Sequence, residues 1–330
     1  MTKKYFPILV AKAGELAALS HLQQEIKNEI CPVIQVLDLN YTKLNAFLDN
    51  WNFVENEIFL DFSILKSDSN RDFESFFRRI LERGVNFKPV INFNDRTDYI
   101  QCVRELLSNN IITDCVVRCK NLNIEEPKNQ IIRDFNIRSE QVSVIIDCGY
   151  ITNTPLANNV ERSISRITNI ASLKQIIIAS GSFPVDLGSI TPNSITHLTR
   201  HEWNFWNLIK QNMIISCPLY YSDYGTKHPI HRESHFRGSC SIKYSTEFEF
   251  VVFRGMVPGA DNLGNNQYIV HSRNLVRSDF YSGNGFSWAD DRIHHYSSLD
   301  ENNHRSQPGS SQTWVEISQN HHITLLTRLL

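Results

Sequence analysis

Short apolar runs alternate with amphipathic stretches of helical period along the first two-thirds of the chain. This alternation is typical of repeated strand–helix units built around a parallel sheet. The candidate strands are Tyr5–Val10, Pro32–Leu37, Glu57–Leu60, Pro89–Phe93, Asp114–Val117, Val142–Ile146, Gln175–Ala179 and Ile214–Tyr221. Because eight is the strand number of a (β/α)8 barrel, the pattern predicts a TIM-like barrel of the α/β class.

Amphipathic segments between these runs are candidate helices. They are Gly14–Ile30, Leu44–Trp51, Asp72–Arg83, Asp98–Asn109, Asn129–Ile137, Asn158–Ile170 and Thr199–Gln211. An open, doubly wound sheet would show the same alternation, but it usually has fewer strands and often a glycine-rich first turn. The turn after the first run is VAKAGE, which lacks that glycine pattern and favours the barrel.

The sequence changes character after Asp223. Residues 224–312 are richer in Gly, Ser, His and aromatic residues, and the alternation in Cys240–Phe253 predicts an antiparallel hairpin. Gln267–Val276 is the candidate for the eighth barrel helix, and Thr313–Leu330 returns to a packed pattern. We therefore predict one domain over residues 1–330, in which residues 224–312 form an elaboration inserted after the eighth strand.

Charge and cysteine content narrow the classes of partner and compartment. Thirty-three Lys and Arg residues balance 35 Asp and Glu residues, so the basic surface of a general nucleic-acid binder is not expected. The seven cysteines follow no CxxC spacing and are expected to be buried thiols in a reducing compartment. The apolar run near the N-terminus is too short for a membrane span. These features predict a cytoplasmic protein without a membrane partner.

Polar residues follow nearly every candidate strand. In a barrel these positions gather at the face that carries active sites, formed by the carboxyl ends of the strands. The polar strand ends include Lys12, Asp38, Asp61, Asn92, Arg118, Asp147, Ser180, Ser182 and Asp223. Several carboxylates around one mouth repel each other, so they need basic side chains or a divalent metal ion, or else they retain protons. Ordinary helix capping and loop solvation remain the alternative for each single position.

Several stretches are similar to one protein family. YFPILVAKAGELAAL at the start, YSDYG, IKYS followed by VVFRG, FSWADD and TWVEISQNHHIT resemble the beta protein family over most of the chain. The resemblance implies a phage- or defence-associated protein and carries over no catalytic residues. It directs attention to Lys12, Glu15, Asp223, Tyr224, Lys243, Arg254, Trp288, His321 and His322.

Two functional hypotheses follow from these residues. The first is a hydrolase or lyase that acts on a phosphorylated or nucleotide-like small molecule at the carboxyl face of the barrel. Its catalytic candidates are Lys12, Glu15, Asp38, Asp61, Arg118, Asp147 and Asp223, and its substrate-binding candidates are Asn92, Ser180, Ser182, Tyr224, Lys243, Arg254, Trp288, His321 and His322. The second is a non-catalytic module of a phage-defence system that recognises a partner protein or a phage component.

Overall fold

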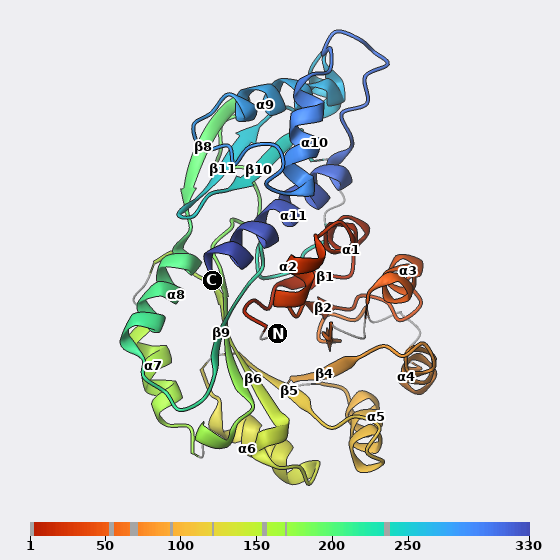
Figure 1. Cartoon of the computed structure of the whole chain (residues 1–330), viewed down its shortest axis with the longest axis vertical. Coiled ribbons are helices and arrows are strands. Elements are labelled where there is room, and N and C mark those ends of the chain that lie inside the picture. Colours follow the sequence, from red (N-terminus) through yellow and green to blue (C-terminus); the bar gives the residue numbers. More distant parts are fainter. Residues whose placement is uncertain are drawn as a thin grey trace.

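Eight parallel strands form a barrel in the computed structural model, which describes residues 3–52, 56–66, 72–92, 95–120, 122–153, 157–168, 170–233 and 238–330 (Figure 1). The strands are β1 (Ile8–Val10), β2 (Val33–Gln35), β3 (Ile58–Asp61), β4 (Phe87–Asn92), β5 (Cys115–Lys120), β6 (Val142–Tyr150), β7 (Gln175–Gly181) and β9 (Leu219–Asp223). The ring closes where Tyr5 forms a parallel bridge with Tyr221. The predicted (β/α)8 architecture is confirmed. Phe93, at the end of the fourth predicted strand, lies outside the described residues.

Helices cover the outside of this barrel. They are α1 (Ala13–Ser20), α2 (Gln24–Glu29), α3 (Thr42–Asn50), α4 (Phe73–Glu82), α5 (Thr97–Ser108), α6 (Glu125–Asp134), α7 (Ala157–Ser165) and α8 (His201–Asn212). The single helix predicted for residues 14–30 was wrong, because the chain turns at residues 21–23 and forms α1 and α2. The predicted α4 begins after Asp72, whose side chain accepts a hydrogen bond from the backbone N–H of Ser75 at 2.9 Å.

Residues along the strands alternate between the barrel interior and the layer beneath the helices. Val33, Phe59, Val90, Val116 and Ile145 belong to one buried apolar cluster inside the barrel. Two positions further along each strand, the inward side chains are Gln35, Asp61, Asn92, Arg118 and Asp147. A polar layer therefore lies directly above the apolar one, toward the carboxyl ends of the strands.

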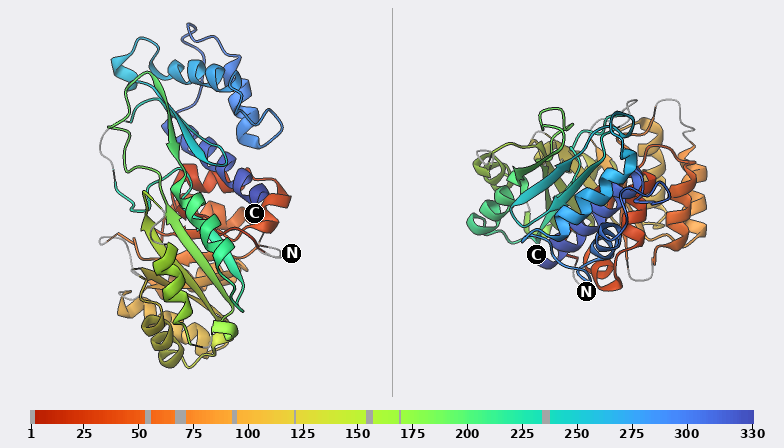
Figure 2. Two further views of the ribbon diagram at one scale, coloured as in Figure 1. Left: turned by 90° about the vertical axis from the view of Figure 1, so that its left-hand side faces the viewer. Right: turned by 90° about the horizontal axis from the view of Figure 1, so that it is seen from above.

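A second, antiparallel sheet lies beside the barrel and has the strand order β10-β11-β8 (Figure 2). It is built from β8 (Ser194–Thr199), β10 (Ser241–Ser245) and β11 (Glu249–Arg254), and α9 (Gln267–Val276) and α10 (Trp288–Ser297) accompany it. We call these five elements the elaboration. The predicted hairpin is confirmed as β10 and β11. The third strand, β8, was not predicted, and it precedes the last barrel strand in the sequence.

The last helix, α11 (Ser311–Leu329), completes the helical layer of the barrel. It packs against α1 and α2 on one side and against β10 and α10 on the other (Figure 1). Its residues Ile323 and Leu326 join the barrel core, whereas Trp314 and Ile317 join the core of the elaboration. The prediction that residues 267–276 form the eighth barrel helix was wrong, because α9 packs on β10 and α10.

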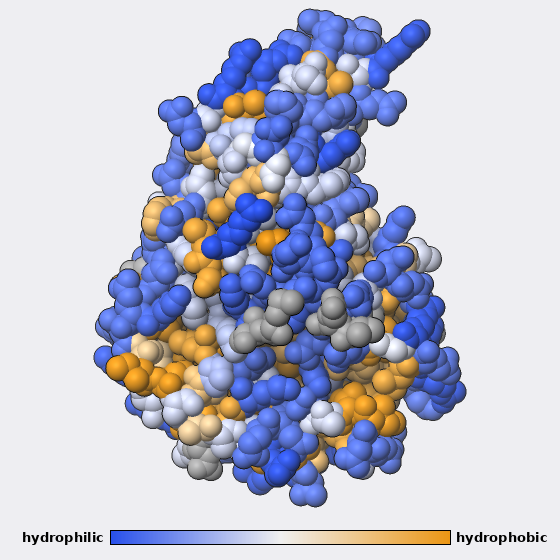
Figure 3. All heavy atoms as spheres, viewed as in Figure 1, coloured by the Kyte–Doolittle hydropathy of each residue, from blue (hydrophilic) through white to orange (hydrophobic). Residues whose placement is uncertain are grey.

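None of the helices within the described ranges is both long and apolar enough to span a bilayer. On the face drawn in Figure 3, hydrophilic side chains predominate and hydrophobic ones form separate patches. All seven cysteines are thiols rather than disulfides.

Gly225, at the exit from β9, gives a first testable prediction. Its φ is +58°, and an added Cβ would lie 1.9 Å from Oε1 of the buried Gln319 on α11. We expect Gly225→Ala to lower the free energy of unfolding by about 1–3 kcal/mol, measured by urea denaturation. Gly84→Ala is the matched control, because Gly84 has a φ of +69° and no atom within 4 Å of its Cβ position. Equal losses in the two variants would contradict a packing role for Gly225.

Candidate functional site

Arg118 lies at the centre of the polar layer inside the barrel and is 3% exposed. Its Nη2 donates to Asp147 Oδ2 at 2.8 Å and to the Tyr224 hydroxyl at 2.7 Å. Its Nη1 donates to Asp61, which also accepts a hydrogen bond from Asn92 Nδ2 at 3.1 Å. One guanidinium group therefore lies between two buried carboxylates contributed by separate strands.

These contacts keep Asp61 ionised. Burial alone would raise the pKa of Asp61, but Arg118 and the hydrogen bonds from Ser63 and Asn92 outweigh it and lower the pKa. Of the carboxylates predicted to converge at the mouth, Asp61 and Asp147 lie together on Arg118, which balances their charge, whereas Asp38 and Asp223 lie elsewhere. Held in this way, the ionised Asp61 contributes to the stability of the polar layer. The catalytic role of Asp61, Asp147 and Arg118 stays a prediction.

Above this layer, three cavities with shared walls form what we call the lysine cleft. Their volumes are about 480, 190 and 430 Å³. Lys227 lines all three cavities. Lys12 and Glu15 line the first and second, and Lys243 lines the second and third. Tyr224 lines the second and connects the cleft to the polar layer.

Ion pairs within the described ranges do not neutralise three of the lysines of the lysine cleft. Within the described ranges, no carboxylate forms an ion pair within 4 Å of Lys12, Lys227 or Lys243. Burial lowers the pKa of Lys12, and burial together with nearby Lys227 lowers the pKa of Lys243 to about 7. Burial raises the pKa of Glu15, whose Oε2 accepts a hydrogen bond from Val10 N at 2.7 Å. The arrangement favours an anionic ligand.

Two further predicted residues border the cleft. Asp38 lines the largest cavity, and its Oδ1 accepts a hydrogen bond from Asn40 N at 2.9 Å. Arg254 lines the third cavity, but its Nη1 donates to the backbone carbonyls of Leu187 and Ile190. Arg254 therefore holds the segment between β7 and β8 against the elaboration.

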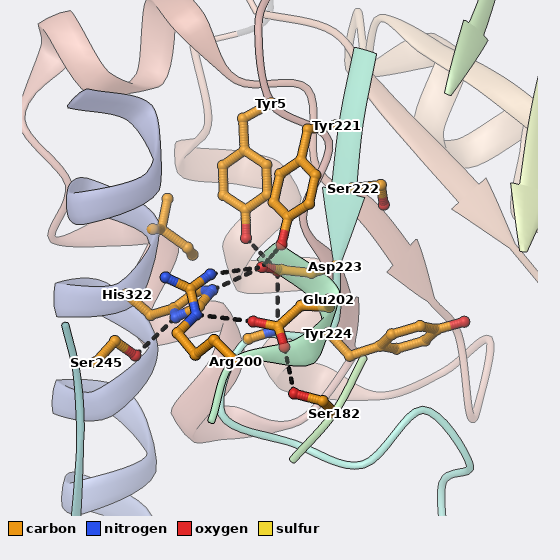
Figure 4. A network of polar contacts seen from close by, with 12 residues as sticks. Tyr5, Ser182, Arg200, Glu202, Tyr221, Ser222, Asp223, Tyr224, Ser245 and His322 are labelled. Atoms are coloured by element: carbon orange, nitrogen blue, oxygen red, sulfur yellow. Dashed lines mark hydrogen bonds and ion pairs between the residues drawn. The ribbon is translucent and has the colours of Figure 1, made fainter. Parts of the chain in front are cut away.

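Asp223 belongs to a separate buried cluster that joins the barrel to the elaboration (Figure 4). Its Oδ2 lies 2.9 Å from His322 Nε2 and accepts a hydrogen bond from the Tyr221 hydroxyl at 2.9 Å, and its Oδ1 accepts one from Tyr5. His322 Nδ1 lies 2.7 Å from Ser245 Oγ. A Ser–His–Asp series is the arrangement of a hydrolase triad, but Ser245 is only 1% exposed and does not line the lysine cleft. We interpret this series as a structural junction of β9, α11 and β10.

Ser182 extends this buried cluster. Its hydroxyl donates to Glu202 and accepts a hydrogen bond from His201 N at 3.2 Å, so it caps the start of α8. Arg200 Nε donates to Glu202 Oε1 at 2.7 Å. Among the described residues, neither Ser180 nor Ser182 contributes to the wall of the lysine cleft. The predicted substrate-binding role of these two serines stays a prediction.

Trp288 and His321 lie away from the cleft. The Trp288 ring stacks on His21 with the ring centroids 4.1 Å apart, which fastens α10 to the end of α1. His321 Nδ1 lies 2.9 Å from Asp290 Oδ2, and His321 Nε2 lies 2.9 Å from the backbone oxygen of Ser245. These contacts hold the elaboration together around α11.

Sequence reasoning missed Lys227, the residue common to all three cavities. Lys227 comes two positions after the glycine of YSDYG, beyond the strand end where polar residues were sought. A search extended into the turn after each strand would have included it. Lys66, which forms an ion pair with Glu233 at 2.7 Å at the largest cavity, was missed for the same reason.

The comparisons with known proteins agree with the resemblance seen in the sequence. No curated protein has a sequence that matches this chain. The family model described as Beta protein matches residues 5–328, a range that includes every residue of the lysine cleft and of the polar layer. The chain therefore belongs to the Beta protein family.

Proposed function

We propose that this protein is a hydrolase or lyase that binds a phosphorylated or nucleotide-like small molecule in the lysine cleft. The observation that carries the proposal is the gathering of Lys12, Lys227 and Lys243 around one cleft, with no carboxylate paired to them in the part of the chain that is described. A phosphate group offers several acceptor oxygens and a double negative charge, so it satisfies several amines at once.

The start of α11 supports the same ligand chemistry. Ser311 and Gln312, in the first turn of this 19-residue helix, line the largest cavity. The N-terminus of a long helix carries a partial positive charge and free backbone N–H groups, which favour anions. Leu37, Tyr41 and Val315 add an apolar wall for the rest of the ligand. A cavity of about 480 Å³ is large enough for a small metabolite.

Glu15 supplies a group for proton transfer in this cleft. It is 3% exposed, and burial raises its pKa above the usual value for a glutamate. A carboxyl group with a raised pKa serves as a general acid or base nearer to neutral pH. With phosphate held by the lysines, Glu15 would donate a proton to a leaving group or accept one from the substrate.

Titration calorimetry with glycerol 3-phosphate and AMP tests the binding step. We expect both phosphate esters to bind, glycerol not to bind, and Lys12→Met or Lys227→Met to weaken binding about 10–100-fold, because each removes a charged hydrogen bond. Lys43→Met is the matched control, since Lys43 is an exposed lysine on α3. If neither ester binds, or if all three variants bind alike, the proposal is wrong.

For the cellular role, we propose that this chemistry acts in the cytoplasm during conflict between phage and host. The resemblance described above and the thiol state of the cysteines support this proposal. Phage plating on cells that express the protein would test it. Protection should disappear in the Lys12→Met, Lys227→Met double variant. Protection that survives in this variant would instead favour a non-catalytic module that recognises a partner.

A further inference from the structure

The elaboration places one amine in the lysine cleft. Lys243 belongs to β10, and its side chain lies where the second and third cavities meet. Its Nζ lies 4.4 Å from the centre of the Phe183 ring and donates to the carbonyl oxygen of Thr226 at 3.3 Å. The long hydrogen bond and the aromatic ring hold the amine in position without supplying a counter-charge.

The surroundings of Lys243 favour the neutral amine. Burial and the neighbouring charge of Lys227 both disfavour a proton on Nζ, and Glu15 only partly opposes them. With the pKa lowered to about 7, a much larger fraction of the Lys243 side chains is neutral at neutral pH than of an ordinary lysine. A neutral amine is a nucleophile, whereas an ordinary surface lysine remains protonated at that pH.

We propose that Lys243 forms an imine with the carbonyl carbon of a phosphorylated aldehyde or ketone bound in the lysine cleft. This inference rests on the proposed function, because Lys12 and Lys227 would hold the phosphate group of the same molecule. It names the substrate class more narrowly than phosphate binding alone does.

The step is balanced without an oxidant or a metal ion. Nζ attacks the carbonyl carbon to form a C–N bond, and the carbonyl oxygen becomes a hydroxyl group. Loss of this hydroxyl as water leaves the protonated C=N group, so amine, carbonyl and one proton yield the protonated imine and water. Glu15 lines the second cavity together with Lys243 and would deliver the proton that the departing hydroxyl needs.

An imine at this position favours a lyase over a hydrolase. The protonated C=N group withdraws electrons from the neighbouring carbon, and it stabilises the electron pair left there when an adjacent bond breaks. Hydrolysis of a phosphate ester needs no such group. The inference therefore selects the cleavage or proton-transfer chemistry of carbonyl compounds for this cleft.

Reductive trapping tests the inference. The full-length protein is incubated with glyceraldehyde 3-phosphate and sodium cyanoborohydride at neutral pH, and the modified lysines are mapped by peptide mass spectrometry. We expect Lys243 to be modified at least about tenfold faster than the exposed Lys43, because far more of its amine is neutral. Modification of Lys243 at the rate of Lys43 would overturn the inference.

Two variants separate imine formation from phosphate binding. Lys243→Met removes the amine, and Lys243→Arg keeps a positive charge but offers no primary amine. We expect both variants to lose the fast trapping, and we expect Lys243→Arg, which keeps the charge, to weaken the binding of glycerol 3-phosphate less than Lys243→Met does. Circular dichroism verifies that each variant is folded. If Lys243→Arg still traps glyceraldehyde 3-phosphate rapidly in the lysine cleft, the assignment of imine formation to Lys243 is contradicted.

The two phosphate compounds also distinguish the possible failures. Glycerol 3-phosphate has no carbonyl group, so its binding reports on the proposed function alone. If it binds and glyceraldehyde 3-phosphate is not trapped at Lys243, the imine inference is overturned and the proposed function stands. If neither glycerol 3-phosphate nor AMP binds, the proposed function fails and the imine inference fails with it.

Discussion

Arg118→Met should lower the free energy of unfolding by about 3–5 kcal/mol, because it leaves two buried carboxylates without the cation between them. The side chains of Arg118 and Asp61 are 1% and 0% exposed, and that of Asp147 is 4% exposed. Methionine preserves much of the length and apolar contact of the arginine stem, so the loss comes mainly from the charge. Urea denaturation followed by circular dichroism at neutral pH measures it.

Rescue by neutralising the partners separates charge from packing. Adding Asp61→Asn and Asp147→Asn to the Arg118→Met variant should recover most of the lost stability, because no uncompensated charge remains. Arg166→Met is the matched control on an exposed site, where a change within about 0.5 kcal/mol is expected. A loss for Arg118→Met as small as that of the control, or no rescue by the two asparagines, would contradict the ion network.

The barrel and its polar layer followed from local sequence pattern. Each strand alternates with a period of two, so one apolar inward residue predicts the next inward position, as Val116 does for Arg118. Strand ends converge in any parallel barrel, which brings Asp61 and Asp147 together whatever the details of the helices. These features depend on short-range periodicity and on the rules of one architecture.

The lysine cleft did not follow from local pattern, because it depends on contacts between distant segments. Lys12 follows β1, Lys227 follows β9, and Lys243 lies on a strand of the elaboration. The periodicity of the sequence does not predict that β10 packs against α11 beside the barrel mouth. The position of the elaboration decides which lysines share a cavity.

The eighth helix of the barrel layer was assigned to the wrong segment for a related reason. The polar residues Gln319, Asn320, His321 and His322 of α11 are buried, although such residues usually mark a solvent-facing surface. Their partners lie far away in the sequence: Asn320 Nδ2 donates to the carbonyl oxygen of Ala18 at 3.0 Å. A helix buried on most sides between two cores lacks a clear apolar stripe, so periodicity could not assign it to the barrel.

Asp223 should carry the second large effect, which depends on pH. Burial alone would raise its pKa, but His322, Arg200 and the Tyr5 hydroxyl lower it far below the usual value for an aspartate. The pKa of Asp223 is lower in the folded state than in the unfolded chain. The ionised carboxylate therefore contributes its full stabilisation at pH values above the pKa that Asp223 has in the unfolded chain. This contribution is lost progressively as the pH falls below about 4, toward the folded-state pKa.

Asp223→Asn should therefore lower the free energy of unfolding by about 3 kcal/mol at neutral pH, and the difference from the wild type should shrink as the solution becomes acidic. Urea denaturation at a series of pH values from neutral to about 3 measures both effects. Asp279→Asn, at an exposed position, should follow the wild-type curve. If the loss in free energy of unfolding is the same at every pH, the asparagine destabilises the protein through its shape or hydrogen bonding rather than through the lost charge. If the difference in free energy of unfolding between the variant and the wild type disappears in acid, the charge of Asp223 stabilises the packing of the last barrel strand against α11.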